Sequence, residues 1–265
     1  MLFIFTLLYN TFIIEITAVN KNMEKEIKIK TQDKHIIYGV LNELGNKSDK
    51  LIIFVHGLTG YKNEHIYYNA VKFFNNKGFS VFRFDLYSDQ NKARLLSQCT
   101  IKIHVSDLNQ VVDYFRKKFE KIFVVGHSMG GATILLSDTS KVDGIVLWDS
   151  SHYKTMKSLI AGDCKYNKCL GVYVLSWGCE YLIGKKMYDE WLKFPKPKEL
   201  MNTIHKPIKI IVANKGVLMA GGKEYFKYAN EPKSFSIIKK ARHGFDEEKT
   251  EERLFQETFS WLRKF

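Results

Sequence analysis

The chain of 265 residues is 45% hydrophobic and 26% charged, the proportions of an ordinary soluble globular protein. These values exclude a disordered chain, a collagen and a polytopic membrane protein. A fold of this length buries about 75% of the surface that its unfolded chain exposes, so it needs no disulfide bond or metal ion for its stability. The four cysteines, at positions 99, 164, 169 and 179, form no CxxC pair. The sequence therefore predicts neither a disulfide scaffold nor a zinc site, and we expect free, mostly buried thiols in a reducing compartment.

Charge is the unusual property of this composition. With 41 Lys and Arg against 28 Asp and Glu, the net charge is +13, which raises the question of a nucleic acid or an anionic membrane as partner. The basic residues are scattered, however, and the longest basic run is Arg116-Lys117-Lys118. No aromatic motif of the RNA-binding kind accompanies it. We therefore predict no nucleic-acid partner.

The first 22 residues form an apolar extension that is treated separately from the domain at 23–265. Residues 2–19 are strongly apolar, but Asn10 and Glu15 interrupt them and no Lys or Arg precedes them, unlike a secretory signal. Met23 lies just before the first strand pattern, so we favour a start at Met23 or a dispensable extension, and a cytoplasmic protein. The alternative is an anchor or imperfect signal, because the length approaches that of a spanning helix. Membrane association is expected only through residues 1–19.

Hydrophobic patterns predict alternating strands and helices from Glu24 onward. Alternating residues over 24–29 and 35–44 predict two half-buried antiparallel strands, and the continuous apolar run 51–55 is typical of a strand that is covered on both faces. Further strands are predicted at 79–84, 122–125, 142–148, 208–213 and 234–239, and helices at 65–77, 107–119 and from about 247. This order predicts an α/β fold with a doubly wound, mostly parallel sheet of about eight strands.

The segment from about 150 to 206 interrupts this order after the sixth predicted strand. A structureless loop of that length is improbable in a globular domain, so the segment predicts an inserted helical cap. It contains six aromatic residues that either line a pocket for an acyl group or pack within the cap itself: Tyr166, Tyr173, Trp177, Tyr181, Tyr188 and Trp191.

A Gly-His-Ser-Met-Gly-Gly motif at 126–131 directly follows the predicted strand 122–125. This is G-x-S-x-G in the context of strand, tight turn and helix, where the serine hydroxyl is exposed above the edge of the sheet. Glycines on either side remove side chains that would clash at such a turn. The motif predicts that Ser128 is a nucleophile.

Two other segments supply groups that a nucleophilic serine needs. His56-Gly57-Leu58 ends the predicted strand 51–55, and in such a fold this loop and the residue after the serine each provide a backbone N–H for an oxyanion. We assign these donors to Leu58 and Met129. His243 follows the last predicted strand, and the carboxyl ends of parallel strands gather on one edge of the sheet. We therefore expect His243 to be the general base.

These motifs resemble those of the α/β-hydrolase superfamily, in particular its serine-aminopeptidase/monoacylglycerol-lipase-like branch, which includes many small esterases. The resemblance covers about Glu24 to the C-terminus and lies in HGLTG at 56–60, RFDL at 83–86, GHSMGG at 126–131 and HGF at 243–245. It implies an α/β-hydrolase fold and a serine acyl-hydrolase that uses no metal or organic cofactor.

The acidic member of a catalytic triad is where the sequence departs from this family. Members commonly carry the acid after the penultimate strand, and here Gly216 occupies that position. Asp149, at the end of the predicted strand 142–148, is the best substitute, and the chain order of serine, acid and histidine is preserved. The alternative is that Asp149 caps a helix that begins at Ser150-Ser151.

Taken together, the residues predict a serine hydrolase that cleaves small carboxylic esters, of the short-acyl or monoacylglycerol type, through an acyl-enzyme on Ser128. A small-molecule ester is thus the expected partner. A peptidase or thioesterase of the same fold is the alternative within enzymes. A catalytically weak hydrolase scaffold that is used for binding is the alternative from another class, and the glycine at 216 favours it.

Overall fold

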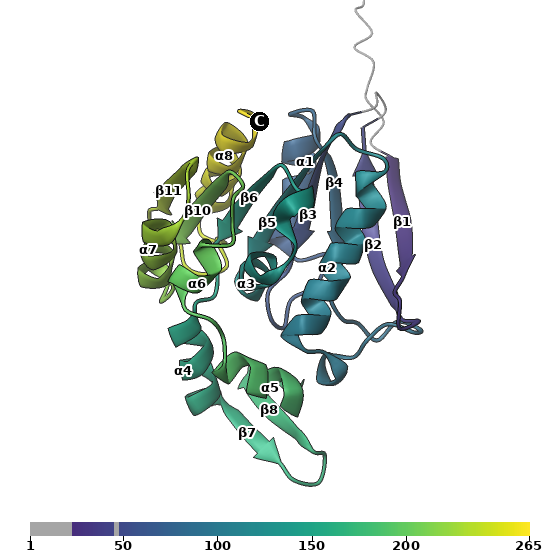
Figure 1. Ribbon diagram of the computed structural model, residues 1–265, viewed down its shortest axis with the longest axis vertical. Helices are drawn as coiled ribbons and strands as arrows, with labels where there is room; N and C mark the ends of the chain where they lie inside the picture. The colour runs from purple at the N-terminus through teal and green to yellow at the C-terminus, as the bar shows by residue number, and fades with distance from the viewer. Residues whose placement is uncertain (1–22, 45–47) are drawn as a thin grey trace, which may run out of the picture.

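The computed structural model describes residues 23–44 and 48–265, so the predictions for the apolar segment 1–22 fall outside the described residues. Its centre is an eight-stranded sheet (Figure 1). The strands are β1 (Met23–Lys30), β2 (Ile36–Glu43), β3 (Lys50–Val55), β4 (Ser80–Phe84), β5 (Lys121–His127), β6 (Gly144–Trp148), β10 (Ile208–Ala213) and β11 (Lys233–Ile238). The predicted doubly wound α/β sheet is confirmed.

The strand order is β1-β2-β4-β3-β5-β6-β10-β11. β2 pairs antiparallel with both β1 and β4, and all remaining neighbours pair in parallel. The six parallel strands include the runs of apolar residues that the sequence shows, and β4, β6 and β10 are buried along their whole length. Burial on both faces is what a parallel sheet between two helix layers requires.

Helices cover both faces of the sheet. On one face, α1 (His65–Asn75) and α8 (Thr250–Leu262) bury residues such as Phe74, Phe255 and Trp261. The other face carries α2 (Ile101–Arg116), α3 (Met129–Leu136), α6 (Pro197–Met201) and α7 (Met219–Tyr228). The stripe of apolar residues in α2, which includes Leu108, Val111 and Phe115, is buried against the sheet, as its helical spacing predicts.

Helix α2 begins at Ile101, six residues before the predicted start at 107. The reason is local: Thr100 stands at the N-cap, and its hydroxyl accepts a hydrogen bond from the Ile103 N–H at 3.1 Å. Such a bond satisfies one of the free donors of the first turn and stabilises the start of a helix. The apolar stripe alone does not show this additional turn.

The inserted segment is not purely helical, so that part of the prediction is wrong. After α4 (Tyr153–Asp163) comes a three-stranded antiparallel sheet of β7 (Cys164–Asn167), β8 (Val172–Trp177) and β9 (Cys179–Gly184), followed by α5 (Lys185–Leu192). In Figure 1 this cap projects beyond the central sheet. Most side chains of its strands are exposed or half-buried, so they show no run of buried apolar residues. Gly171 and Gly178, with φ of +66° and +76°, form the two turns.

The four cysteines are all free, but only Cys99 is buried. Cys164 is half-buried, and Cys169 and Cys179 are exposed, so the expectation of mostly buried thiols is wrong. The three cysteines outside the core all belong to the cap, whose thin sheet has no interior of its own large enough to cover them.

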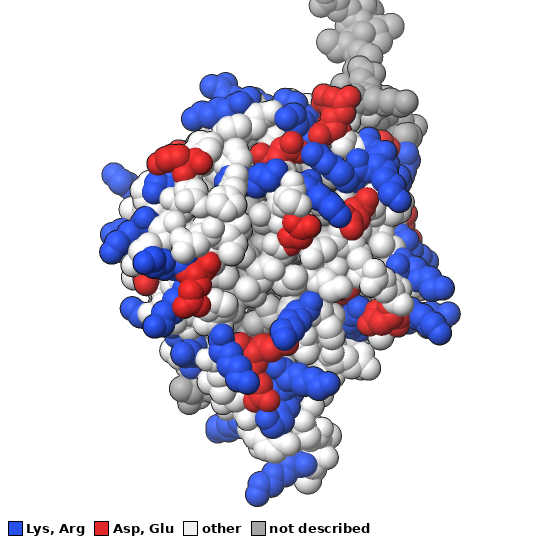
Figure 2. All heavy atoms as spheres, in the orientation of Figure 1, with Lys and Arg blue, Asp and Glu red and all other residues white. Residues whose placement is uncertain are grey.

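Surface charge and helix length are relevant to the nucleic-acid and membrane partners considered above. On the face shown in Figure 2, Lys and Arg side chains are spread over the domain and the cap, with Asp and Glu among them. Within the described residues, every helix is too short or too polar to cross a bilayer.

Candidate active site

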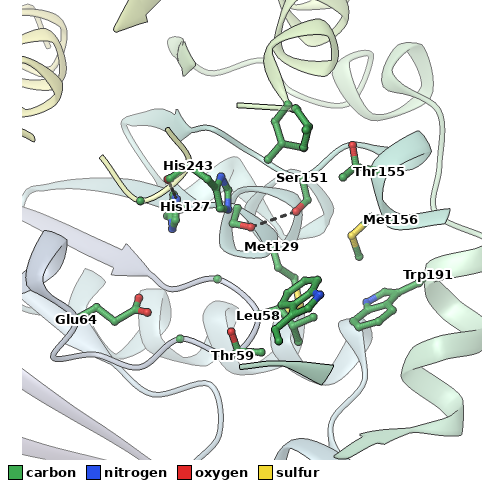
Figure 3. Close-up of a pocket in the computed structure, with 17 residues that line it drawn as sticks. Leu58, Thr59, Glu64, His127, Met129, Ser151, Thr155, Met156, Trp191 and His243 are labelled. Atoms are coloured by element: carbon green, nitrogen blue, oxygen red, sulfur yellow. Dashed lines mark hydrogen bonds between the residues drawn. The ribbon is translucent and has the colours of Figure 1, made fainter. Parts of the chain in front are cut away.

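A cavity of about 400 Å³ lies where the carboxyl ends of the central strands meet the cap (Figure 3). Loops that follow β3, β5, β6 and β11 line it from the sheet side, and α4, α5 and β8 line it from the cap. Ser128, His243, Leu58 and Met129 are all lining residues. The fold therefore brings together side chains and backbone groups that lie as far as 185 positions apart in the sequence, as counted from Leu58 to His243 (243 − 58).

Ser128 lies on a strained turn between β5 and α3. Its φ of 55° and ψ of −121° place it in a region that residues with side chains rarely adopt, and such strain persists only where the surrounding structure enforces it. The enforcement comes from close backbone packing: a Cβ at Gly130 would lie 2.1 Å from the Val55 carbonyl oxygen. Only glycine allows helix α3 to begin so near strand β3. The Ser128 side chain is thereby presented to the cavity.

The Ser128 hydroxyl lies 3.4 Å from the Ser151 hydroxyl, and the two are within hydrogen-bond distance (Figure 3). The backbones of these residues are also joined, since the Ser151 N–H donates to the Ser128 carbonyl at 2.9 Å. Ser151, three positions after the end of β6, is thus fixed beside Ser128. In this structure Ser151 is the hydrogen-bond partner of the Ser128 side chain, while His243 faces the same cavity.

His243 and Asp149 form a direct pair. The His243 Nδ1 atom lies 2.7 Å from Asp149 Oδ2, so Nδ1–H donates to the carboxylate and Nε2 is left without that proton. Asp149 is fully buried, whereas the His243 side chain is 45% exposed. The other carboxylate oxygen accepts the Ala213 N–H at 3.1 Å. Asp149 is therefore held by the end of β10 and oriented toward the imidazole.

The alternative role of Asp149 as a helix cap is not observed. The N-cap residue of α4 is His152, whose side chain faces the Lys154 N–H. Gly216, by contrast, lies beside the acid: a Cβ at this position would be 3.1 Å from Asp149 Oδ2. The carboxylate of Asp149 thus lies where a side chain at position 216 would point.

Leu58 and Met129, the two predicted oxyanion donors, both line the cavity. Met129 is the first residue of α3, and Leu58 belongs to the loop after β3. Within the part of the chain that the structure describes, neither N–H donates a hydrogen bond to another backbone group. The loop lies against the serine, because a Cβ at Gly57 would be 3.0 Å from the Ser128 Cβ. Both N–H groups are therefore left available at residues that line the same cavity as Ser128.

Comparison with known proteins agrees with this fold. Residues 46–160, which include Leu58, Ser128 and Met129, match the family model described as serine aminopeptidase, S33. Comparison with curated protein sequences gives no match. Solved structures share the fold over nearly the whole chain. Because their sequence identities are only 16–21%, this similarity concerns the fold alone.

The esterase domain of a Rhodothermus marinus protein is 17% identical with a TM-score of 0.72, and the alignment covers 91% of this chain and 98% of that one. Est1E from Butyrivibrio proteoclasticus with bound ferulic acid is 16% identical with a TM-score of 0.76, over 90% and 98%. The Pyrococcus furiosus esterase Pf2001 is 21% identical with a TM-score of 0.68, over 92% and 93%. The chain therefore has the α/β-hydrolase fold.

His127 is a residue of the site that the sequence reasoning missed. Its Nε2–H donates to the His243 carbonyl at 2.8 Å, and the two imidazole rings are 4.5 Å apart. Burial, with a smaller effect of nearby His243, lowers the pKa of His127 to about 3, so it is neutral near pH 7. The signal was its place in the motif, next to the serine, but only the structure shows that it contacts the loop of His243.

His56 and Asp85 fix the loops around the cavity. His56 Nδ1–H donates to the Gly57 carbonyl at 2.8 Å, and Nε2 accepts the Leu86 N–H at 2.9 Å. Asp85 accepts the Lys62 N–H at 2.8 Å and pairs with the Lys62 ammonium. These bonds join the loop after β3 to the loop after β4 and hold Leu58 in place.

Of the six cap aromatics, Trp177 and Trp191 line the cavity. Tyr173 instead stacks on Tyr188 with ring centroids 3.5 Å apart, and Tyr166 packs on Tyr173. The two tryptophans thus line the cavity, and these three tyrosines pack within the cap. Within residues 23–44 and 48–265, no group of three or more His, Cys, Asp or Glu side chains is arranged to hold a metal ion.

Proposed function

We propose that this α/β hydrolase is a serine esterase that cleaves small carboxylic esters through an acyl-enzyme on Ser128. The observation that carries the proposal is the 2.7 Å hydrogen bond between buried Asp149 and His243 in the cavity that Ser128 enters from a strained turn. A buried acid that orients an imidazole near an exposed serine is the arrangement that serine acyl transfer requires.

The chemistry follows from the positions of the polar groups. The Ser128 hydroxyl leaves Ser151, gives its proton to His243 Nε2 and attacks the ester carbonyl. Asp149 keeps the proton of His243 on Nδ1 and stabilises the imidazolium that forms. The N–H groups of Leu58 and Met129 bind the oxyanion, and loss of one such donor typically lowers the rate about a hundred-fold or more.

The second half of the reaction uses the same groups. His243 protonates the oxygen of the leaving alcohol, which departs and leaves an acyl group on Ser128. His243 then removes a proton from water as the water attacks the acyl-enzyme, and the carboxylic acid is released with the serine restored. Each proton that His243 accepts is returned within the cycle, so no other reactant is required.

A small acyl group is favoured by the size and lining of the cavity. Its volume is about 400 Å³, and apolar side chains from the cap, including Met156, Trp177 and Trp191, form one wall. Pockets of this size and character suit small apolar ligands. Several of the solved structures that share the fold are named esterases, which supports esters over other acyl substrates. The family model, which is named for an aminopeptidase, keeps a peptidase as the second candidate.

The proposal is tested by labelling with a fluorophosphonate probe and by hydrolysis of p-nitrophenyl esters of increasing acyl length. We expect labelling and hydrolysis in the wild type, loss of both in Ser128→Ala, and neither loss in Ser140→Ala, an exposed serine outside the cavity. Amino-acid p-nitroanilides and acyl thioesters are assayed in parallel. Faster turnover of one of these identifies a peptidase or thioesterase. Wild-type protein that is neither labelled nor active would identify a binding scaffold.

A further inference from the structure

One end of the cavity carries a carboxylate that the mechanism above does not use. Glu64 lines the cavity together with Ser128 and His243 (Figure 3). It occupies the N-cap position of α1, where a short polar side chain such as Asp commonly accepts a hydrogen bond from the first turn of the helix. Here the side chain makes no such bond. Glu64 is therefore not engaged in capping, although its position in the sequence would allow it.

The Glu64 carboxylate has no partner within the part of the chain that is described. It takes part in no hydrogen bond there, and its electrostatic neighbours include His65 and His243. The phenols of Tyr67, Tyr87 and Tyr181 are also close enough to be affected by its charge. Burial raises the pKa of Glu64, and the positive forms of the two histidines oppose the rise. A Cβ at Gly60 would lie 2.9 Å from Glu64 Oε2, so the glycine leaves the room that the carboxylate occupies. Glu64 is half-buried, and its carboxylate therefore keeps acceptor oxygens available for a donor that enters the cavity.

The cavity has two chemically different ends. In Figure 3, Met156 and Trp191 lie to the right of Leu58, and Glu64 and His243 lie to its left. In ester cleavage, His243 protonates the oxygen of the leaving alcohol, so that alcohol must lie next to the imidazole. The acyl group then occupies the apolar end. The alcohol is directed toward Glu64.

We propose that Glu64 binds a hydrogen-bond donor on the leaving alcohol, and that the substrates are esters of polyols or of protonated amino alcohols rather than of simple alkyl alcohols. The inference rests on the proposed esterase function and specifies its substrate class. The shared chemistry is an O–H or N–H group a few bonds beyond the ester oxygen. Glu64 is then a specificity-determining residue that contacts the substrate without taking part in proton transfer.

The test compares three butyrate esters with the same acyl group: propyl butyrate, glycerol monobutyrate and 2-(dimethylamino)ethyl butyrate. The readout is the ratio of kcat/KM for each donor-bearing ester to kcat/KM for propyl butyrate. We expect Glu64→Ala to lower at least one ratio about tenfold or more, since hydrogen bonds to charged groups are the stronger ones. The matched control Glu252→Ala, at an exposed position of α8, should retain the wild-type ratios.

The outcomes separate the two sources of the donor. A lower ratio for the glycerol ester identifies a polyol, and a lower ratio for the dimethylaminoethyl ester identifies an amino alcohol. Unchanged ratios in Glu64→Ala overturn the inference. Glu64→Gln, which keeps the size of the side chain, replaces the alanine variant if that variant does not fold, and it should lower the ratio for the ammonium ester. Wild-type protein that is labelled at Ser128 but shows ratios near one contradicts the role of Glu64 alone. Wild-type protein without labelling contradicts the esterase itself.

Discussion

The carboxylate of Asp149 lies in the space that a side chain at Gly216 would enter, since a Cβ there would be 3.1 Å from Asp149 Oδ2. The two positions follow neighbouring strands: Asp149 comes directly after β6, and Gly216 comes three residues after β10. An acid on either strand can therefore approach the same face of His243. Glycine at 216 leaves that place to Asp149 and avoids two carboxylates in contact.

Replacing Asp149 by Asn should lower kcat by about 10³–10⁴-fold with little change in fold, because the wrong tautomer of His243 would be favoured. The amide oxygen can still accept the Ala213 N–H, so the local backbone should be kept. Steady-state kinetics with p-nitrophenyl butyrate measure the effect. Unchanged turnover would remove Asp149 from the site.

We also expect that an aspartate at position 216, after β10, can take over the role of Asp149. In Asp149→Ala, addition of Gly216→Asp is expected to raise kcat at least tenfold above the single variant, because the new carboxylate starts close to the vacated position. Gly216→Asp alone is the control, and like-charge repulsion with Asp149 should make it less stable than the wild type. A double variant no faster than Asp149→Ala would show that the approach from β10 differs from the approach from β6.

His127→Ala should lower kcat about 10- to 100-fold and affect KM less. The substitution removes the hydrogen bond to the His243 carbonyl and the contact between the two rings, so the imidazole of His243 is less well oriented, and small errors of placement are costly in catalysis. His205→Ala, at an exposed position, is the matched control. Circular dichroism and the Tm of each variant separate misplacement from unfolding. Full activity in His127→Ala would mean that Asp149 alone positions the base.

Gly57→Ala should lower kcat at least tenfold. A Cβ at this position would lie 3.0 Å from the Ser128 Cβ and 3.5 Å from its Oγ, so the loop must shift and carry the Leu58 N–H away from the oxyanion. Gly162→Ala provides the comparison, since a Cβ there meets no atom within 4 Å. Equal kcat for Gly57→Ala and the wild type would argue that Leu58 is not a donor.

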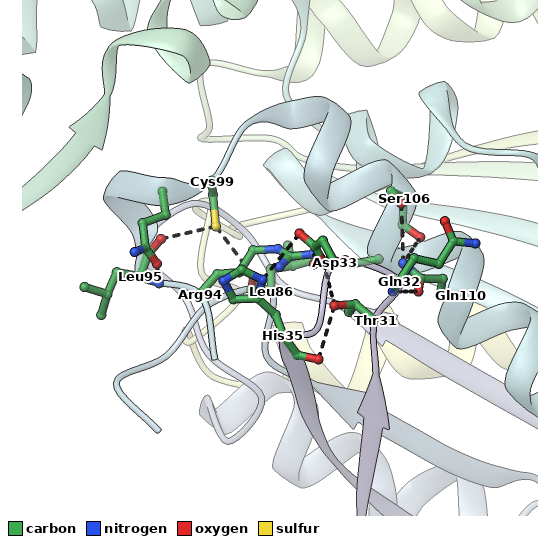
Figure 4. Close-up of polar contacts among 12 residues, drawn as sticks. Thr31, Gln32, Asp33, His35, Leu86, Arg94, Leu95, Cys99, Ser106 and Gln110 are labelled. Atoms are coloured by element: carbon green, nitrogen blue, oxygen red, sulfur yellow. Dashed lines mark hydrogen bonds and ion pairs between the residues drawn. The ribbon is translucent and has the colours of Figure 1, made fainter. Parts of the chain in front are cut away.

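The free energy of unfolding should depend on pH in part through the ionisation of Asp107. Arg94 joins this buried residue to Asp33, and the Arg94 Nη2 atom is 2.9 Å from an oxygen of each carboxylate; Figure 4 shows the contact with Asp33. Burial raises the pKa of Asp107 to about 6, although Arg94 opposes the rise. The folded state thus binds the proton more tightly than the unfolded state does. This group lowers the free energy of unfolding as the pH rises from about 4 to about 6.

In Asp107→Asn that contribution is absent, so the free energy of unfolding should fall less, or rise more, between pH 4 and pH 6 than in the wild type. Urea unfolding at pH 4, 5, 6 and 7 measures the difference. Asp113→Asn, an exposed position on the same helix, should follow the wild-type curve. Parallel curves for Asp107→Asn and the wild type would show that Asp107 is ionised normally in the folded protein.

The features that depend on neighbours in the chain could be predicted from the amino-acid sequence. The parallel sheet follows from apolar runs of strand length, and the sharp turn at Ser128 follows from a strand, a Gly-x-Ser-x-Gly motif and a helix in succession. The start of α2 at Thr100 was also a local signal, and the capping hydroxyl could have indicated it. The sheet of the cap could not be predicted in this way, because its strands are short and mostly exposed and their hydrophobic pattern is correspondingly weak.

Contacts between distant segments were decided only by the tertiary structure. The sequence offered Asp149 with an alternative role, and the position of β6 beside β10 places its carboxylate at His243 and next to Gly216. His127 contacts His243, and Glu64 lines the same cavity. These three residues come from distant parts of the chain, so the sequence alone did not show that they lie together. The physical reason is that hydrophobic periodicity and turn chemistry depend on residues close together in the sequence. The site, in contrast, is assembled from the ends of strands that are far apart in the sequence and are brought together by packing of the sheet.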